Sequence, residues 1–334
     1  MNPHHHPRRT ALATALAASL GLAAALAGTA AQAQAGYPSK PILVIVPLQA
    51  GSAADVATRI VTGKMAENMK TSFMIDNQPG VSGLIGAEKV VRAAPDGYTL
   101  GGITDSVLNY AVNLAAKVNF DPVNDFQSIS QMADISWVLV SNKDFAPKNV
   151  GELIAQARAE PGKIDFASGG NGSPQHISMA LFAAANKINL THVPYKGATQ
   201  ATTDVSGGQI PIMFSAVSVA LPFIKEGRLR ALAQPNLKRS PLLPDVPTFA
   251  EAGASAFQFS TWLGLYGPKG LPRPLVDRLN AEVAKAVADP GVRERLAQLG
   301  LDPVASQPEQ LHELTKNGYA RVGKAIKDAG IKAE

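Results

Sequence analysis

The sequence predicts an α/β fold with mostly parallel sheets, and two observations support this prediction. Short apolar runs typical of strands alternate with longer segments in which apolar residues recur every three or four positions, as in helices. Turns rich in glycine and proline separate the two kinds of segment. Of the 334 residues, 46% are hydrophobic and 17% are charged, so the chain can also bury a sizeable core.

The first 35 residues have the pattern of a bacterial secretory signal peptide. Arg8 and Arg9 precede an apolar run over residues 11–27, and two small-x-small cleavage sequences follow it. We expect cleavage after Ala33 or Ala35 and export to the periplasm. A membrane anchor is the alternative, but the run is shorter than the roughly 20 apolar residues of a membrane span, and polar sequence follows at once.

From residue 42 onward, strand and helix patterns alternate. The apolar run over 42–46 predicts a buried strand, and an apolar stripe over 56–69 predicts the helix that follows it. Pro211 predicts that the strand over 210–213 is bulged or lies at a sheet edge. Further strands are expected over 98–103, 137–140, 164–167, around 193 and over 229–233, and further helices over 150–160 and 177–184.

The last part of the chain is predicted to be mainly helical. Apolar residues have helical spacing over 276–287 and again over 311–326. Before them, the aromatic segment 257–265 ends in glycine–proline breakers, which favours a long strand that returns the chain to its first domain.

Charge and composition exclude several classes of function. The chain holds 31 Lys+Arg and 26 Asp+Glu, and loss of the two leader arginines leaves 29 against 26, or +3. This weak balance, with no basic run, argues against a nucleic-acid partner. Cysteine is absent, and the three histidines that follow the leader, His176, His192 and His312, do not have metal-ligand spacing. We therefore expect no metal and no cofactor.

Two strand-to-helix turns are candidate anion sites. In the first, over 47–55, Gly51 lets the backbone approach a ligand and Ser52 can cap the next helix. In the second, over 167–176, three glycines in four residues precede Ser173 and Pro174, a good N-cap and first helical residue. Helix starts offer free N–H groups to a carboxylate or phosphate. The alternative for each segment is an ordinary capped turn.

Three further side chains are candidates near these turns. His176 falls in the first turn of a helix, where it either has a structural role or donates to a ligand. A catalytic pair with Ser173 is not favoured, because the Gly-x-Ser-x-Gly pattern and a nearby acid are both missing. Tyr195 and Lys196 follow a strand end, where they either reach into a cleft or form an exposed amphipathic pair.

A series of motifs in a fixed order resembles one known family. The chain from Tyr37 to its C-terminus is similar to the Bug family, the periplasmic solute receptors of tripartite tricarboxylate transporters. The motifs that carry the resemblance are Tyr37-Pro38-Ser39-Lys40-Pro41, Val46-Pro47 with Gly51 and Asp55, Asn77-Gln78-Pro79-Gly80, Ala94-Pro95-Asp96-Gly97-Tyr98, Phe166-Ala167-Ser168 through Ser173 and His176, His192-Val193-Pro194-Tyr195-Lys196-Gly197, and Leu243-Pro244-Asp245-Val246-Pro247.

The resemblance implies a two-lobed periplasmic-binding-protein fold of type II, with the ligand in the cleft between the lobes. One lobe would comprise residues 36–136 and 261–334, and the other residues 137–260, with crossings near 136–137 and 260–262. The resemblance also implies a monomer that binds a carboxylate through backbone and hydroxyl groups and delivers it to membrane permease subunits. The ligand-binding residues expected on this basis are Gln49, Ala50, Gly51, Ser52, Asp55, Thr104, Ser168, Gly170, Gly172, Ser173, His176, Tyr195, Lys196, Gly197 and Ser215.

The sequence departs from the family pattern at several of these positions. Leu48 replaces a usual aromatic residue, and Ser52 and Ser82 each replace a usual glycine. Ser215 stands where an acidic residue is common, which favours a carboxylate ligand without an amine, either aliphatic or aromatic.

Other functions and contacts remain open at the level of sequence. A sensor that contacts a membrane signalling partner would need the same lobes, and an α/β hydrolase would need an activated nucleophile that the sequence does not show. Trp262 and Phe214 either stack on a ligand ring or pack in the core.

Overall fold

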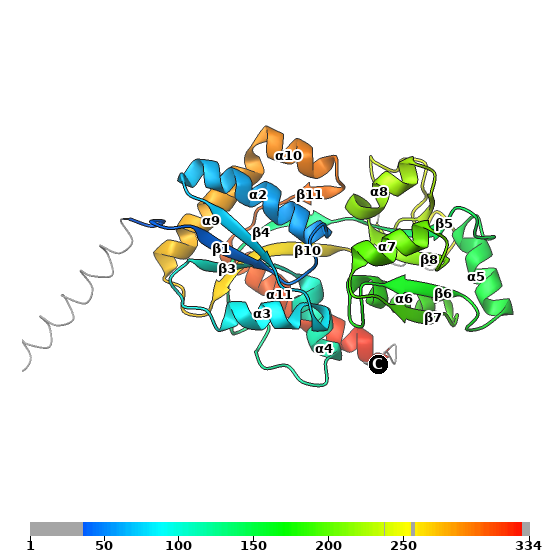
Figure 1. Ribbon diagram of the computed structural model, residues 1–334. Coiled ribbons are helices and arrows are strands. Elements are labelled where there is room, and N and C mark those ends of the chain that lie inside the picture. The colour runs from blue at the N-terminus through cyan, green and yellow to red at the C-terminus, as the bar shows by residue number, and fades with distance from the viewer. Residues whose placement is uncertain (1–35, 237, 255–257, 329–334) are drawn as a thin grey trace, which may run out of the picture. The chain divides into compact units, whose positions relative to one another are not determined.

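Two mixed β-sheets, each flanked by helices, form the framework of residues Pro41–Glu334, which are one compact unit (Figure 1). The computed structural model describes residues 36–236, 238–254 and 258–328. The predicted signal peptide over 1–35 and the first residue of the predicted strand at Phe257 lie outside the described residues. We call the part built on the six-stranded sheet the first lobe and the part built on the five-stranded sheet the second lobe.

The first lobe contains a six-stranded sheet in the order β11-β4-β10-β3-β1-β2. The apolar run of β1 pairs in parallel with both β2 and β3 and is almost entirely buried, as expected for a strand covered on both faces. β10 runs antiparallel to β3 and β4. The strands are β1 (Ile42–Val46), β2 (Phe73–Asn77), β3 (Thr99–Thr104), β4 (Phe126–Ile135), β10 (Thr261–Pro268) and β11 (Leu301–Pro303).

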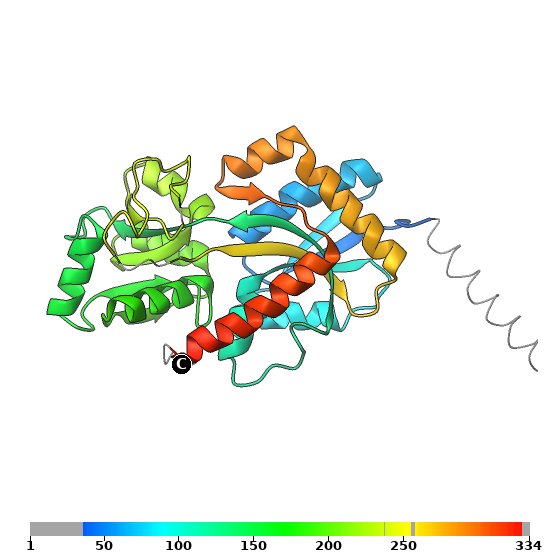
Figure 2. The same cartoon turned by 180° about the vertical axis from the view of Figure 1, so that it is seen from behind.

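Helices cover both faces of this sheet (Figures 1 and 2). Gly102 of β3 faces Thr58 of α2, whereas Gly264 of β10 faces Leu311 of α11. A core cluster that includes Ile103, Tyr266 and Leu311 fills one of the faces. The helices are α2 (Ala53–Met69), α3 (Leu84–Val91), the π-helix η2 (Ser106–Ala111) with α4 (Val112–Leu114), α9 (Arg273–Ala288), α10 (Pro290–Ala297) and α11 (Pro308–Asp328), with the 3₁₀ turn η1 (Val81–Gly83) before α3.

The second lobe repeats the same strand order in a five-stranded sheet. Its order is β7-β6-β8-β5-β9. Taken from its β2 edge, the first sheet has the order β2-β1-β3-β10-β4, which corresponds strand for strand, and β11 is an additional edge strand. This is the type II arrangement that the family resemblance implied. The elements are β5 (Trp137–Asn142), α5 (Val150–Ala159), β6 (Asp165–Ser168), α6 (Pro174–Asn186), β7 (Thr191–Pro194), α7 (Ala198–Ser206), β8 (Ile212–Ala216), α8 (Val217–Lys225) and β9 (Leu229–Ala233).

The sheets are mixed, so the prediction that they are mostly parallel was wrong. Strands that enter a sheet from the other lobe run against their neighbours: β5 is antiparallel to β8 and β9, and β10 is antiparallel to β3 and β4. β4 ends at Ile135 and β5 begins at Trp137, while β9 ends at Ala233 and β10 begins at Thr261. The exact lobe boundaries stay a prediction.

Individual strands also differ from the expectation. The strand over 210–213 is interior rather than at an edge, because β8 lies between β6 and β5 and begins after Pro211. Pro211 still contributes its carbonyl, which accepts a hydrogen bond from the backbone N–H of Asn142 at 2.8 Å. The strands β2, β4 and β11 were not predicted.

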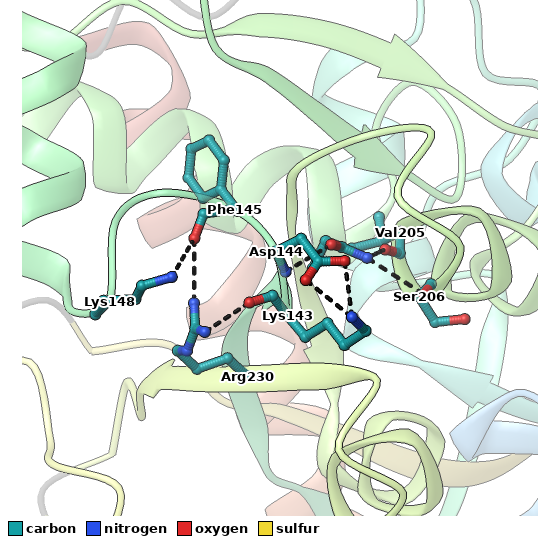
Figure 3. Close-up of polar contacts among 8 residues, drawn as sticks. Lys143, Asp144, Phe145, Lys148, Val205, Ser206 and Arg230 are labelled. Carbon is teal, nitrogen blue, oxygen red and sulfur yellow. Dashed lines mark hydrogen bonds and ion pairs between the residues drawn. The ribbon is translucent and has the colours of Figure 1, made fainter.

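A polar network closes the end of the second sheet where β5 finishes (Figure 3). The guanidinium group of Arg230 donates to the carbonyl oxygens of Lys143 at 2.6 Å and Phe145 at 3.2 Å. The side-chain amide of Asn142 donates to the carbonyl of Val205 at 3.0 Å. These bonds join β9 and α7 to the turn after β5, so they stabilise the lobe away from the residues that line the cleft described next.

Candidate functional site

A cleft of about 950 Å³ is lined by residues of both lobes. The first lobe contributes the segments after β1, β2 and β3, and the second lobe contributes the segments after β6, β7 and β8. Carboxyl ends of parallel strands are the usual place for ligands in α/β sheets. The lining residues are 47–49, 52–54, 79–84, 104, 106, 111, 114–117, 135, 137, 169–176, 194–198, 216, 219 and 261.

Four of the helices that begin at this cleft are α2, α6, α7 and α8. Lining residues include Ala53 and Ala54 at the start of α2, Gln175 in the first turn of α6, Ala198 at the start of α7 and Ala216 as the N-cap of α8. The first N–H groups of a helix lack intrahelical partners and carry a partial positive charge. Among the described lining residues there is no Asp or Glu, and the lysines are Lys117 and Lys196. The cleft therefore suits an anion.

The loop over Gln49–Ser52 is built as the sequence predicted, but only part of it reaches the cleft. The hydroxyl of Ser52 accepts a hydrogen bond from the N–H of Asp55 at 3.3 Å and so caps α2. Gly51 has φ 77°, a conformation that favours glycine. Gln49 and Ser52 line the cleft, whereas Ala50 and Gly51 do not.

Asp55 lies behind this loop rather than in the cleft lining. Its carboxylate accepts hydrogen bonds from Gly51 N–H at 2.9 Å, Arg59 Nε at 2.9 Å and Asn77 Nδ2 at 3.0 Å. Burial alone would raise the pKa of Asp55, but these three bonds outweigh burial and lower the pKa. Asp55 is thus an ionised group outside the cleft lining that holds the loop through the N–H of Gly51.

The second loop, over Ser168–His176, also has the predicted cap. The Ser173 hydroxyl accepts from His176 N–H at 3.4 Å, and Pro174 occupies the first helical position. Gly170 and Gly172 have φ of 116° and 76°, so both adopt conformations that favour glycine. All of these residues except Ser168 line the cleft; the Ser168 hydroxyl turns inward and accepts from Gly170 N–H at 3.0 Å.

His176 is part of a stack of three rings. Its ring lies parallel to that of His192, with centroids 4.0 Å apart and planes within 1°. Phe166 lies against both imidazoles, with its ring centroid 4.8 Å from that of His192 and 6.3 Å from that of His176. His176 Nδ1 accepts a hydrogen bond from Gly172 N–H at 3.1 Å. Burial, and next the neighbouring His192, lower the pKa of His176 to about 4, so the ring is uncharged at neutral pH.

Hydrogen bonds between described residues join the two lobes directly across the cleft. The side-chain amide of Gln49 donates to the carbonyl of Lys196 at 3.0 Å and passes over Gly197, where a Cβ atom would lie 1.8 Å from Gln49 Oε1. The hydroxyl of Ser82 donates to the carbonyl of Asn171. The lobes therefore meet across the cleft in this conformation.

The loop that carries Ser82 has an unusual backbone. Four consecutive residues, 80–83, have positive φ, including 47° at Val81 and 52° at Ser82. A β-branched residue in this region is a rare outlier. Val81 is 66% exposed and lines the cleft.

The structure brings most, but not all, of the predicted site residues together. Those that line the cleft are Gln49, Ser52, Thr104, Gly170, Gly172, Ser173, His176, Tyr195, Lys196 and Gly197. Those outside the lining are Ala50, Gly51, Asp55, Ser168 and Ser215. Ser215 is fully buried, and its hydroxyl donates to the carbonyl of Ala216 at 3.3 Å.

Sequence reasoning missed much of the apolar wall. Val81, Leu114, Trp137 and Val219 line the cleft, and alanines occupy many of the other positions. Trp137 was noted only as a crossing point; its indole N–H donates to Thr261 Oγ1 at 2.9 Å. No motif marks the other three as ligand contacts.

Phe214 and Trp262, the two aromatic candidates for stacking on a ligand, lie outside this wall. Phe214 packs against Phe182 and Phe249, and Trp262 belongs to the core of the first lobe. Both therefore serve core packing.

Neither a metal site nor a membrane-spanning helix is found within the described part of the chain. Over residues 36–236, 238–254 and 258–328, no three His, Cys, Asp or Glu side chains are grouped so that they could hold a metal ion. Within the same ranges, every helix is too short or too polar to cross a membrane.

Two lobes of type II strand order around one cleft define the class of the protein as a solute-binding receptor with the periplasmic-binding-protein fold. Comparison with known families then gives a specific assignment. Residues 57–331 match the model of TctC, the tripartite tricarboxylate transporter family receptor, and the chain belongs to this family. The resemblance read from the sequence motifs is thereby confirmed.

Three relatives illustrate the match. A UPF0065 protein in the tcbD-tcbE intergenic region of Pseudomonas sp. strain P51 is 38% identical over 317 residues, covering 95% of this chain and 94% of the relative. The solved structure of R. palustris Rpa4515 with adipate has a TM-score of 0.86 at 29% identity, covering 89% of this chain and 99% of that one. MatC (Rpa3494) from Rhodopseudomonas palustris with bound malate has a TM-score of 0.82 at 31% identity, covering 87% and 100%.

Proposed function

We propose that this protein is an exported receptor that captures a small carboxylate without an amine and delivers it to the membrane subunits of a tripartite tricarboxylate-type transporter. The observation that carries the proposal is the convergence of four helix starts on a cleft whose described lining holds no Asp or Glu. The family assignment supports the same conclusion.

Uncharged donors can supply much of the required affinity. A hydrogen bond to a charged group contributes about 1.5–3 kcal/mol, and a micromolar Kd corresponds to about 8 kcal/mol. Two such bonds from helix starts, with burial of the ligand's carbon skeleton against Leu114, Trp137 and Val219, are enough to reach that range. The lining residues from the predicted set, other than His176, are the proposed contacts, and Asp55 and Ser168 hold the loops that carry them.

The absence of a lining acid favours a ligand without an amine. An ammonium group buried in this cleft would have no carboxylate partner among the described lining residues, and an unpaired buried charge is strongly unfavourable. The adipate and malate that name two solved relatives are both amine-free carboxylates, which is consistent with this reading.

A thermal-shift panel tests the proposal. It contains adipate, malate and benzoate, their amide analogues, amino acids and neutral sugars. A ligand at one hundred times its Kd stabilises the native state by about 2.7 kcal/mol, which raises the melting temperature of a chain of this size by roughly 5 °C. We expect at least one amine-free carboxylate to give this shift and its amide to give none. A shift with amino acids or sugars alone would contradict the proposal.

The same protein and ligand panel distinguish the receptor from two alternative functions, a hydrolase and a sensor. Recovery of a chemically altered ligand would favour a hydrolase, and recovery of the unchanged ligand favours a receptor. A sensor role would be indicated by capture of a signalling partner instead of the permease subunits when the closed, ligand-bound protein is presented to membranes.

Export is part of the proposal. Cleavage after Ala33 or Ala35 predicts that protein recovered from the periplasm begins at Gln34 or Gly36. N-terminal sequencing of a membrane-bound chain that still carries Met1 would refute the signal peptide.

A further inference from the structure

His176 and His192 form a pair that is positioned to control the glycine-rich loop of the second lobe. Their rings are parallel and 4.0 Å apart, and His176 is only 5% exposed. Two imidazolium ions at this separation would repel each other strongly, because little water can enter between stacked rings to screen them. The stack is therefore compatible with neutral rings and unfavourable for charged ones.

Each ring is connected to one amide group of the loop Gly169–Gly172. His176 Nδ1 accepts directly from Gly172 N–H at 3.1 Å. His192 Nε2 lies 2.6 Å from the Ser168 hydroxyl, and that hydroxyl accepts from Gly170 N–H at 3.0 Å. Gly170 and Gly172 are also the two loop residues with positive φ. The histidine pair thus holds the two most unusual backbone positions of a loop that lines the cleft.

We propose that the neutral His176–His192 pair positions the loop Gly169–Gly172 for ligand binding, and that protonation of His176 releases the loop and weakens carboxylate binding. The second half of this statement rests on the proposed function, whereas the first half concerns only the loop. In this role His176 is a positioning residue that acts through Gly172, which differs from the direct ligand donor considered from the sequence.

The direction of the pH effect follows from the hydrogen bond. A protonated His176 carries a hydrogen on Nδ1, so it can no longer accept from Gly172 N–H. His192 is the titratable group among the described residues whose charge acts on the pKa of His176, and Phe166 completes the stack without charge. Because the pKa of His176 is lowered to about 4, the loop should stay ordered from pH 8 to about 5 and loosen as the pH approaches 4.

Nuclear magnetic resonance of the exported chain tests the positioning role without any ligand. An N–H···N hydrogen bond transmits a scalar coupling between its two nitrogen atoms, here Gly172 N and His176 Nδ1. We expect this coupling at pH 7 and its loss as the pH falls toward 4, together with a shift of the Gly170 and Gly172 amide signals. Absence of the coupling at pH 7, or amide signals that do not respond to titration of His176, would overturn the proposal.

Two variants separate positioning from a general structural role. His176→Asn keeps an acceptor near the position of Nδ1 but cannot titrate, so it should hold the loop and remove the pH response below 5. His176→Leu has no acceptor and should bind adipate about tenfold more weakly than His176→Asn at pH 7.5, the cost of one hydrogen bond. Melting curves establish that both variants fold.

The two proposals fail in distinguishable ways. Equal adipate affinity of the Leu and Asn variants would overturn the positioning role even if wild type binds adipate well. If wild type binds no carboxylate of the panel, the proposed function is refuted, and the coupling between Gly172 and His176 alone decides whether the pair positions the loop. Adipate itself takes up protons in acid, and this affects wild type and His176→Asn equally. The ratio of the two affinities at each pH therefore measures the effect of His176 alone.

Discussion

Gly197→Ala should weaken ligand binding by blocking a contact between the lobes. Gly197 has φ 175°, an extended conformation open to any residue, so alanine introduces no backbone strain. Its Cβ would lie 1.8 Å from Gln49 Oε1, and the flexible end of Gln49 must move away. The bond from Gln49 Nε2 to the Lys196 carbonyl, at 3.0 Å, is then lost.

The expected magnitude follows from that one bond. An intramolecular hydrogen bond contributes about 1 kcal/mol net, so the closed form should become about fivefold less populated relative to the open form. In a free protein that is mostly open, a ligand that binds the closed form then loses about fivefold in apparent affinity, while the melting temperature of the free protein changes little. Calorimetric titration with the best carboxylate of the panel measures this loss, and small-angle scattering measures closure.

Gln49→Ala is the matched control, because it removes the same bond from the other lobe. If the reasoning is correct, each single variant loses about fivefold and the double variant loses no more than either. Fully additive losses would show that Gly197 and Gln49 act independently. Wild-type affinity in Gly197→Ala would refute the argument that this contact stabilises the closed form.

Two further substitutions test the loops. Ser173→Ala should reduce carboxylate affinity ten- to a hundredfold if its hydroxyl contacts the ligand, and a melting curve must accompany the titration because loss of the helix cap alone costs about 1 kcal/mol. Asp55→Asn should destabilise the protein by about 1–3 kcal/mol at pH 7, measured by urea unfolding. The pKa of Asp55 is lowered in the native state, so its stabilising effect is complete above the ordinary value near 3.8 and disappears as the pH falls through the native value. The gap between wild type and Asp55→Asn should therefore close in acid, and a constant gap would contradict the ionised network.

Apolar periodicity was sufficient to predict the fold class and most of the second lobe, but it failed where a strand buries polar groups. β4 contains Ser128, Ser130 and Gln131, all buried, and its pattern does not resemble a core strand. A distant segment provides partners for this strand: Ser130 Oγ donates to the Ser306 carbonyl at 3.0 Å, and the backbone N–H of Gln131 donates to Ser306 Oγ at 3.0 Å. A contact across 176 positions leaves no local signal.

The candidate site shows a similar limit. Caps and glycines predicted two loops that line the cleft, because those residues are dictated by local backbone geometry. The direction of each side chain depends on packing, so Asp55 and Ser168 were predicted as contacts although they point away from the cleft lining. Val81 and Val219 line the cleft without any motif, since an apolar side chain there looks the same in sequence as one in the core.

The placement of the two tryptophans has a practical consequence for measuring ligand capture. Trp137 lies where the chain first crosses between the lobes, lines the cleft, and is tied by its indole N–H to Thr261 at the second crossing. Trp262, the only other tryptophan in the sequence, is enclosed in the core of the first lobe. One indole can therefore sense the occupant and the bend between the lobes while the other provides a constant background emission. We expect the emission of Trp137 to change when the cleft is occupied, and Trp262→Phe would isolate that signal without attaching a dye.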